Sequence, residues 1–111
     1  MSNKFPDQAR VVIIGGGAIG CATAYHLAKK GCKDVIILER NKLTSGSTWH
    51  AAGAYAQFRT DPNAGRMMAY GGELYAGLEE ETGQATGWNQ TGGMRVACTV
   101  ERRREYERAI T

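Results

Sequence analysis

Cysteine, proline and long apolar runs are scarce in this sequence of 111 residues. The three cysteines are odd in number and lack a Cys-x-x-Cys or Cys-x-x-His spacing, which argues against a disulfide framework and a zinc site. No run of about 18 apolar residues occurs, so no membrane-spanning helix is expected. The first residues, MSNKFPDQAR, contain neither the apolar core of a signal peptide nor an Arg-rich, acid-free transit peptide. We therefore expect a soluble cytoplasmic protein, with the mitochondrial matrix as the alternative if a transit peptide has been removed.

A large excess of one charge is also absent, because 14 basic and 11 acidic residues are interspersed and give a net charge of +3. This balance predicts no nucleic-acid-binding surface. The densest charged stretch, ERRREYER at residues 101–108, alternates in sign at helical spacing and is interpreted as a solvated helix face. With 42% hydrophobic residues the chain has a globular composition, and we expect one domain at most, with a hydrophobic core.

The N-terminal part predicts a strand, a helix and a second strand. Residues 11–14 and 35–38 are short β-branched apolar runs, the pattern of strands buried on both faces of a parallel sheet. Residues 18–30 between them are rich in Ala, Leu and Lys, and Gly31 follows where a glycine commonly ends a helix. A βαβ unit of this kind predicts the fold class α/β, with a Rossmann-like nucleotide-binding domain.

Glycine is abundant, with 15 residues in discrete clusters. Gly15, Gly17 and Gly20 have G-x-G-x-x-G spacing directly after the first predicted strand: the first permits a tight turn, the second lets the backbone approach a diphosphate, and the third lets helix and strand pack closely. The N-terminus of the following helix, from Ala18, offers free N–H donors to phosphates. Glu39 ends the second strand, where a carboxylate would accept hydrogen bonds from ribose hydroxyls and repel a 2′-phosphate. The pattern therefore favours NAD or FAD over NADP.

The second half predicts two helices and a strand. Asp61 as N-cap, with Pro62 at the first helical position, begins a helix that Gly83 ends. Gly71 and Gly72 weaken this prediction, because each costs roughly 1 kcal/mol in a helix interior. The remaining predicted elements are a strand over residues 94–98 and a helix that begins in the last eleven residues.

Residues 41–60 show no apolar periodicity, and long loops of this kind inside compact domains are usually functional. Their small-residue stretch, NKLTSGSTWHAAG, offers hydroxyl and backbone groups to a diphosphate and to the edge of a flat heterocycle, which indicates a flavin. Ser47 and Thr48 are candidate hydroxyl donors, although capping of a short helical turn would use the same side chains. His50 could act as a nucleophile through a neutral imidazole nitrogen.

The sequence resembles the FAD-dependent amine oxidoreductases of the D-amino-acid oxidase and glycine oxidase superfamily, and within it the sarcosine and dimethylglycine dehydrogenases. The matching motifs are VVIIGGGAIG, AYHLAKKG, VIILER, LTSGSTWHAAG, LEEETGQATGW and QTGGMRVA. The resemblance implies that residues 1–111 are the N-terminal part of an FAD-binding domain, with the substrate domain absent from this chain. It also implies oxidative N-demethylation of sarcosine or dimethylglycine, with tetrahydrofolate or water receiving the one-carbon product and oxygen or an electron carrier as oxidant.

By the same resemblance, His50 matches a histidine that carries FAD covalently, and Arg40 matches an arginine that flanks the adenosine. For His50 the alternative is a histidine that contacts a non-covalent flavin, and for Arg40 it is an arginine of the protein surface. No catalytic residue and no metal ligand is expected in this segment, which alone should be inactive. The expected cofactor-binding residues are Gly15, Gly17, Ala18, Gly20, Glu39, Arg40, Ser47, Thr48, His50 and Gly53. Two other readings stay open, an NAD-dependent dehydrogenase domain and a non-catalytic nucleotide-binding fragment.

Overall fold

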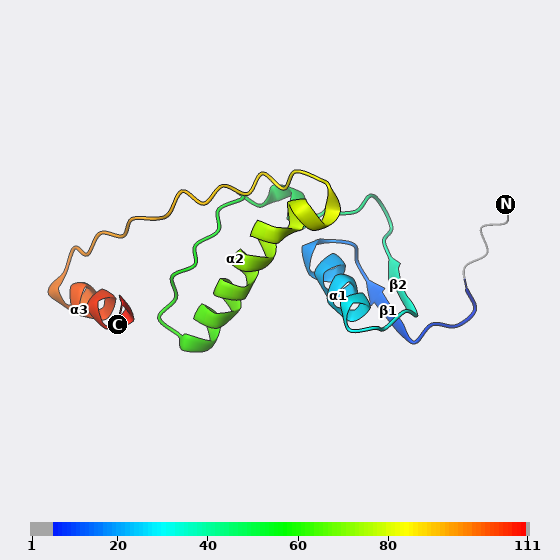
Figure 1. The fold of residues 1–111 in the computed structure, drawn as a ribbon, viewed down its shortest axis with the longest axis horizontal. Coiled ribbons are helices and arrows are strands. Elements are labelled where there is room, and N and C mark those ends of the chain that lie inside the picture. Colours follow the sequence, from blue (N-terminus) through cyan, green and yellow to red (C-terminus); the bar gives the residue numbers. More distant parts are fainter. Residues whose placement is uncertain (1–5, 111) are drawn as a thin grey trace. The chain divides into compact units, whose positions relative to one another are not determined.

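A computed structural model describes residues 6–110 of the chain (Figure 1). Its contacts divide the chain into two compact units, the first ending at Gly53 and the second beginning at Ala54. The secondary-structure elements, in chain order, are β1 (Val11–Ile14), α1 (Ala18–Lys29), β2 (Val35–Leu38), the 3-10 helix η1 (Ser47–His50), α2 (Pro62–Thr82) and α3 (Val100–Ile110).

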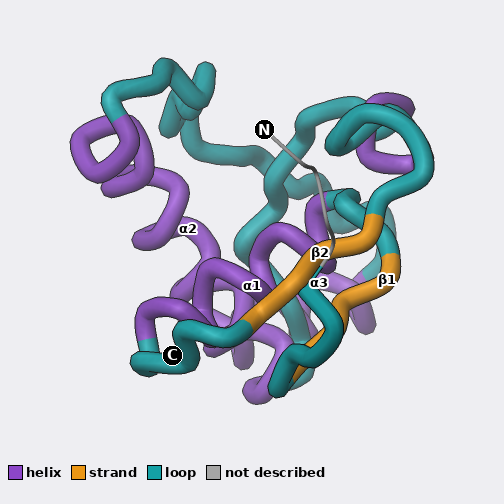
Figure 2. Tube along the Cα trace, turned by 90° about the vertical axis from the view of Figure 1, so that its right-hand side faces the viewer, coloured by secondary structure: helices purple, strands orange, loops and turns teal. Residues whose placement is uncertain are grey.

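The first unit is the predicted βαβ unit. Strands β1 and β2 pair in parallel, in a register that runs from Val11 opposite Val35 to Ile14 opposite Leu38, and Figure 2 shows the two strands side by side in orange. Helix α1 connects them and packs on both strands. Both strand predictions are confirmed at their bounds, and the helix ends one residue earlier than expected, with Lys30 as its C-cap.

The predicted burial of these strands on both faces is wrong for this chain. In β1 the side chains alternate between half-buried and exposed, and Val12 and Ile14 are 51% and 87% exposed. Leu38 is exposed on the same face of the sheet, because it pairs with Ile14. A single helix covers only one face of a two-stranded sheet. No hydrophobic residue in the described range is fully buried, so the expected hydrophobic core is absent there.

The second unit contains the long helix α2, whose ends are those the sequence predicts. The Asp61 carboxylate caps its N-terminus by accepting a 2.7 Å hydrogen bond from the Ala64 N–H, and Pro62 occupies the first turn. Gly83 ends the helix in the left-handed conformation, with φ of 70°. The left-handed conformation favours glycine, because glycine has no Cβ to clash with the backbone.

The glycine pair inside α2 lies where an aromatic residue packs on the helix. A Cβ at Gly71 would overlap the Tyr55 hydroxyl, and one at Gly72 would lie 3.8 Å from the same ring. Tyr55 also packs edge-on against Tyr75 and Trp88, at centroid distances of 5.8 and 5.5 Å. The two glycines therefore allow a close approach that a larger residue would prevent, which accounts for a feature that weakened the helix prediction.

Substitution of Gly71 with alanine should therefore lower the free energy of unfolding of the full-length protein by about 1 kcal/mol, despite the higher helix propensity of alanine. The Tyr55 ring cannot move aside cheaply, because its hydroxyl donates to the Met68 carbonyl and its ring contacts two other aromatic residues. Gly77→Ala is the matched control, since nothing lies within 4 Å of its Cβ position. It should stabilise α2 by roughly 0.5–1 kcal/mol. Denaturant unfolding measures both changes, and an equal gain in the two variants would contradict the packing of Tyr55.

The strand predicted over residues 94–98 does not form. In the described part of the chain these residues make no ladder with another strand, and Met94 and Val96 are 91% and 72% exposed. A β-strand is stable only when its backbone pairs with a neighbouring strand, and an alternating pattern of side chains does not provide that neighbour. The segment instead contacts the rest of its unit through Arg95, whose guanidinium lies 4.6 Å from the centroid of the Phe58 ring. Phe58 in turn packs edge-on against Tyr106 of α3.

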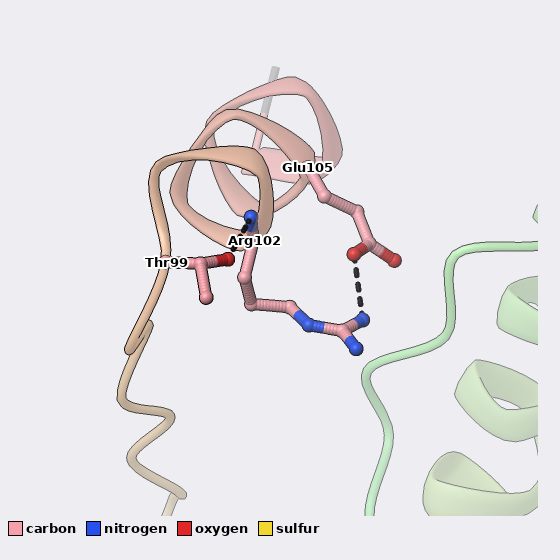
Figure 3. A network of polar contacts seen from close by, with 3 residues as sticks. All are labelled: Thr99, Arg102 and Glu105. Carbon is pink, nitrogen blue, oxygen red and sulfur yellow. Dashed lines mark hydrogen bonds and ion pairs between the residues drawn. The ribbon is translucent and has the colours of Figure 1, made fainter.

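Helix α3 is the solvated, charge-alternating helix that the sequence predicts. Figure 3 shows its N-terminal turn, where the Thr99 hydroxyl accepts a 3.2 Å hydrogen bond from the Arg102 N–H and Arg102 pairs with Glu105 at 2.7 Å. A second pair joins Arg103 to Glu107 at 2.8 Å. All four charged side chains are at least one-third exposed, so each ion pair adds little to the free energy of unfolding.

Candidate functional site

The candidate site lies at the carboxyl ends of β1 and β2. Gly15 follows β1 with φ of 103°, a conformation that favours glycine, and its N–H donates a 2.8 Å hydrogen bond to the Leu38 carbonyl. An open depression of about 560 Å³ lies at this edge, within the size range of small-molecule sites. It is lined by Ile14, Gly15, Ile37, Leu38, Glu39 and Arg40. Ligands of open α/β sheets bind at this end of the strands.

Both carboxylate oxygens of Glu39 are fixed by backbone donors. Oε2 accepts a 2.8 Å hydrogen bond from the Gly16 N–H, and Oε1 accepts a 2.9 Å hydrogen bond from the Asn41 N–H. The Gly16 bond, followed by the Asn41 bond, lowers the pKa of Glu39 below its ordinary value, and the neighbouring Arg40 acts in the same direction. The group is therefore an ionised acceptor at neutral pH. Each oxygen keeps a second lone pair, so the carboxylate can still accept hydrogen bonds from two hydroxyls of one ligand.

Gly20 has the predicted role in helix-strand packing. A Cβ at this position would overlap the Gly15 carbonyl oxygen and would lie 3.4 Å from the Ile13 Cγ2 atom. Gly17 makes room for a side chain from a distant segment, because its Cβ would lie 3.1 Å from the Thr48 hydroxyl oxygen. The approach that the sequence predicted at Gly17 was that of a diphosphate, and the contact with Thr48 was not predicted.

The Thr48 hydroxyl reaches the N-terminus of α1. Its Oγ1 accepts a 2.9 Å hydrogen bond from the N–H of Ala18, the first residue of the helix. Ser47 begins η1 and is exposed, like Arg40. The structure thus brings Ala18 and Thr48 together, although 30 residues separate them in the sequence. The Ala18 N–H is therefore not the free donor that the sequence predicted.

His50 ends the short helix η1 and is exposed. Its Nδ1 lies 3.0 Å from the Gly46 carbonyl oxygen. A carbonyl can only accept, so this hydrogen bond requires the proton on Nδ1 and leaves the Nε2 lone pair of a neutral imidazole available for chemistry. Gly53, with φ of 71°, turns the chain three residues later, at the end of the first unit.

Two contributions to this site were missed from the sequence. Gly16, the middle glycine of the cluster, is buried and supplies the N–H that holds Glu39. Its carbonyl accepts a 2.9 Å hydrogen bond from the Thr44 N–H, and Thr44 has a positive φ of 64°. The run of three glycines pointed to a special backbone here, but nothing in the sequence pointed to Thr44.

The residues that the structure describes contain no cluster of His, Cys, Asp or Glu side chains able to hold a metal ion. Within the same range no helix is both long and apolar enough to cross a membrane.

Comparison with known proteins gives consistent matches over nearly the whole chain. The family model described as "DAO: FAD dependent oxidoreductase" matches residues 10–111. The chain is 47% identical over 108 residues to dimethylglycine dehydrogenase, mitochondrial, of Rattus norvegicus, which covers 97% of the chain and 13% of that protein. It is 45% identical over 111 residues to sarcosine dehydrogenase, mitochondrial, of Mus musculus, covering 99% of the chain and 12% of that protein.

A further relative is named as a regulatory subunit. The chain is 43% identical over 101 residues to the pyruvate dehydrogenase phosphatase regulatory subunit, mitochondrial, of Mus musculus, covering 91% of the chain and 12% of that protein. The chain therefore spans 12–13% of the length of these relatives.

Proposed function

The chain belongs to the family of FAD-dependent oxidoreductases, and we propose that it supplies the dinucleotide-binding segment of an enzyme that oxidises N-methylated amino acids. The observation that carries this proposal is the ionised carboxylate of Glu39, held at the end of β2 beside residues 15–17, which we call the glycine turn. The names of the dimethylglycine and sarcosine dehydrogenases support the substrate class. In this proposal residues 1–111 are the N-terminal part of the FAD-binding domain, and the substrate-binding residues lie elsewhere in the protein.

The residues at the site fit the adenosine diphosphate half of FAD. Glu39 has two oxygens with acceptor capacity left for the ribose hydroxyls, and its negative charge disfavours a 2′-phosphate. The N-terminus of α1 offers a partial positive charge to the diphosphate. The Thr48 hydroxyl accepts from Ala18 and keeps its own O–H as a donor. The proposed cofactor-binding set is Gly15, Gly17, Ala18, Gly20, Glu39, Arg40, Ser47, Thr48, His50 and Gly53.

His50 is proposed as the point of covalent attachment. Its Nδ1 is engaged with the Gly46 carbonyl, so Nε2 is the nitrogen that would bond to the flavin 8α carbon. Formation of this N–C bond would break one C–H bond of the 8-methyl group. The ring system would take up the electron pair of that bond and two protons, one from the methyl group and one that the imidazole would lose from Nδ1, so no external oxidant would be needed.

When bound, the flavin supplies the two-electron acceptor for the amine, while the chain described here binds and orients it. We assign no catalytic residue within this segment. For the whole protein, the proposal includes an electron acceptor and the capture of the one-carbon product by tetrahydrofolate or water. The names of the relatives refer to mitochondrial proteins, which favours the mitochondrial alternative over the cytoplasmic expectation.

The substrate class is tested by mixing the full-length, flavin-containing protein anaerobically with sarcosine, with dimethylglycine and, as the control, with glycine, which has no N-methyl group. We expect one of the two N-methylated compounds to bleach the visible flavin band and glycine to leave it unchanged. Bound flavin that neither compound bleaches would contradict the substrate class while leaving FAD binding intact. That result would favour the alternative of a non-catalytic nucleotide-binding protein.

A further inference from the structure

We infer that Thr48 is a positioning residue for the attachment of FAD at His50: its hydroxyl fixes η1, which carries His50, against the N-terminus of α1. This inference rests on the proposed function, because it concerns how the proposed linkage is made. The juxtaposition that carries it is the 2.9 Å hydrogen bond from the Ala18 N–H to the Thr48 Oγ1 atom.

Within residues 6–110 this hydrogen bond is the one that joins η1 to another element. The other hydrogen bonds of η1 close on the same short segment: the Trp49 N–H donates to the Gly46 carbonyl at 3.2 Å, and the Ala51 N–H donates to the Thr48 carbonyl at 3.2 Å. Thr48 is half-buried, whereas Trp49 is 76% exposed. The Thr44 N–H bond to the Gly16 carbonyl holds the chain before η1, and among the described residues the Thr48 hydroxyl is what fixes η1 itself.

The histidine ring is fixed to the turn. The contact of His50 Nδ1 with the Gly46 carbonyl spans the whole of η1, so the ring and the turn share one orientation. Thr48 lies two residues before His50, within the same helical turn. Holding Thr48 on Ala18 therefore sets the direction of Nε2 relative to the glycine turn.

The glycine turn and the start of α1 are also where the diphosphate is proposed to bind. The Thr48 hydroxyl lies in the space that the missing Cβ of Gly17 leaves open and accepts from the Ala18 N–H at the start of α1. The same contact thus sets the position of the nucleophile relative to the bound cofactor. Bond formation requires reacting atoms about 3–3.5 Å apart, and a misplacement of about 1 Å can slow a reaction ~100-fold. Loss of the Thr48 hydrogen bond should slow the linkage far more than it weakens binding.

The test uses full-length apoprotein, mixed with saturating FAD and sampled over time for covalent flavin fluorescence on denaturing gels. Thr48→Val keeps the shape of the side chain and removes the hydroxyl, and it should slow the linkage about 100-fold. Thr48→Ser restores the hydroxyl and should return the rate close to that of the wild type. Thr23→Val is the matched control on α1, because the Thr23 hydroxyl bonds only to the Ile19 carbonyl of its own helix and is exposed. It should leave the rate unchanged.

Binding is measured separately in the His50→Ala background, where no linkage forms. There Thr48→Val should weaken FAD affinity by only about 10-fold, the lower end of the cost of losing one hydrogen bond to a charged group. Linkage at the wild-type rate in Thr48→Val, or a loss of affinity as large as the loss of rate, would overturn the positioning role alone. Wild-type protein that binds FAD without ever linking it would contradict the proposed attachment itself, and the role of Thr48 with it.

Discussion

Replacement of His50 with alanine in the full-length protein should abolish the flavin fluorescence of the denatured polypeptide, while the folded protein still binds FAD. The imidazole is the group proposed to form the bond, and alanine offers no nucleophile in its place. The adenosine contacts proposed for Glu39 and for the N-terminus of α1 do not involve His50, so binding should persist. Acid precipitation followed by a denaturing gel under ultraviolet light measures the covalent fraction directly.

The other histidine of the chain provides the matched control. His26 lies within α1, where its ring packs edge-on against Tyr25, and it has no proposed role in cofactor binding. His26→Ala should retain the full fluorescence of the denatured band. A band that persists in His50→Ala would show that another residue carries the flavin. A wild-type protein that holds flavin when folded but gives a dark denatured band would show that the cofactor is not covalent.

Gly20→Ala should lower the free energy of unfolding of the full-length protein by about 3 kcal/mol, the upper end of the usual cost of overpacking. The added Cβ would overlap the Gly15 carbonyl oxygen and would lie 3.1 Å from its carbonyl carbon. These are backbone atoms, and Gly15 is pinned to β2 by its hydrogen bond to Leu38. The clash cannot be relieved by rotating a side chain, so either α1 or the glycine turn must shift. Because that turn is proposed to hold the diphosphate, the purified variant should also contain less flavin than the wild type.

Gly65→Ala is the control for the removal of a glycine as such. Gly65 lies in α2, and nothing is found within 4 Å of its Cβ position. Its replacement should leave flavin content unchanged and raise stability by roughly 0.5–1 kcal/mol. Chemical denaturation and flavin absorbance of the purified proteins measure both effects. Equal stability and flavin content in Gly20→Ala and the wild type would contradict the close contact between α1 and the glycine turn.

Local chemistry made much of this fold predictable. The bounds of β1 and β2 follow from short β-branched runs, and the ends of α2 follow from a capping carboxylate and a left-handed glycine. Each of these signals acts within a few residues. The expected strand at 94–98 failed because a strand also depends on a partner that its own sequence cannot reveal. The expected hydrophobic core is absent from the described residues for a related reason, because a side chain is buried only where another segment covers it, and its own sequence does not show which segment that is.

The site divides in the same way. The glycine spacing and Glu39 were recognisable because the strand, turn and helix that place them are adjacent in the sequence. The contacts of Thr48 with Ala18 and of Gly16 with Thr44 join segments separated by about 30 residues through loop conformations that have no periodic pattern. The orientation of the His50 ring depends on the tight turn at Gly46, which the composition of the loop did not specify.

The two backbone donors on Glu39 also bear on the speed and selectivity of ligand recognition. A glutamate on an open surface samples many rotamers. A ligand that binds only one of them must fix that rotamer, which costs side-chain conformational entropy. Here two backbone hydrogen bonds hold the carboxylate in one orientation. The proposed recognition of a ribose diol would then need little further ordering of the protein, which is the advantage of a pre-organised receptor.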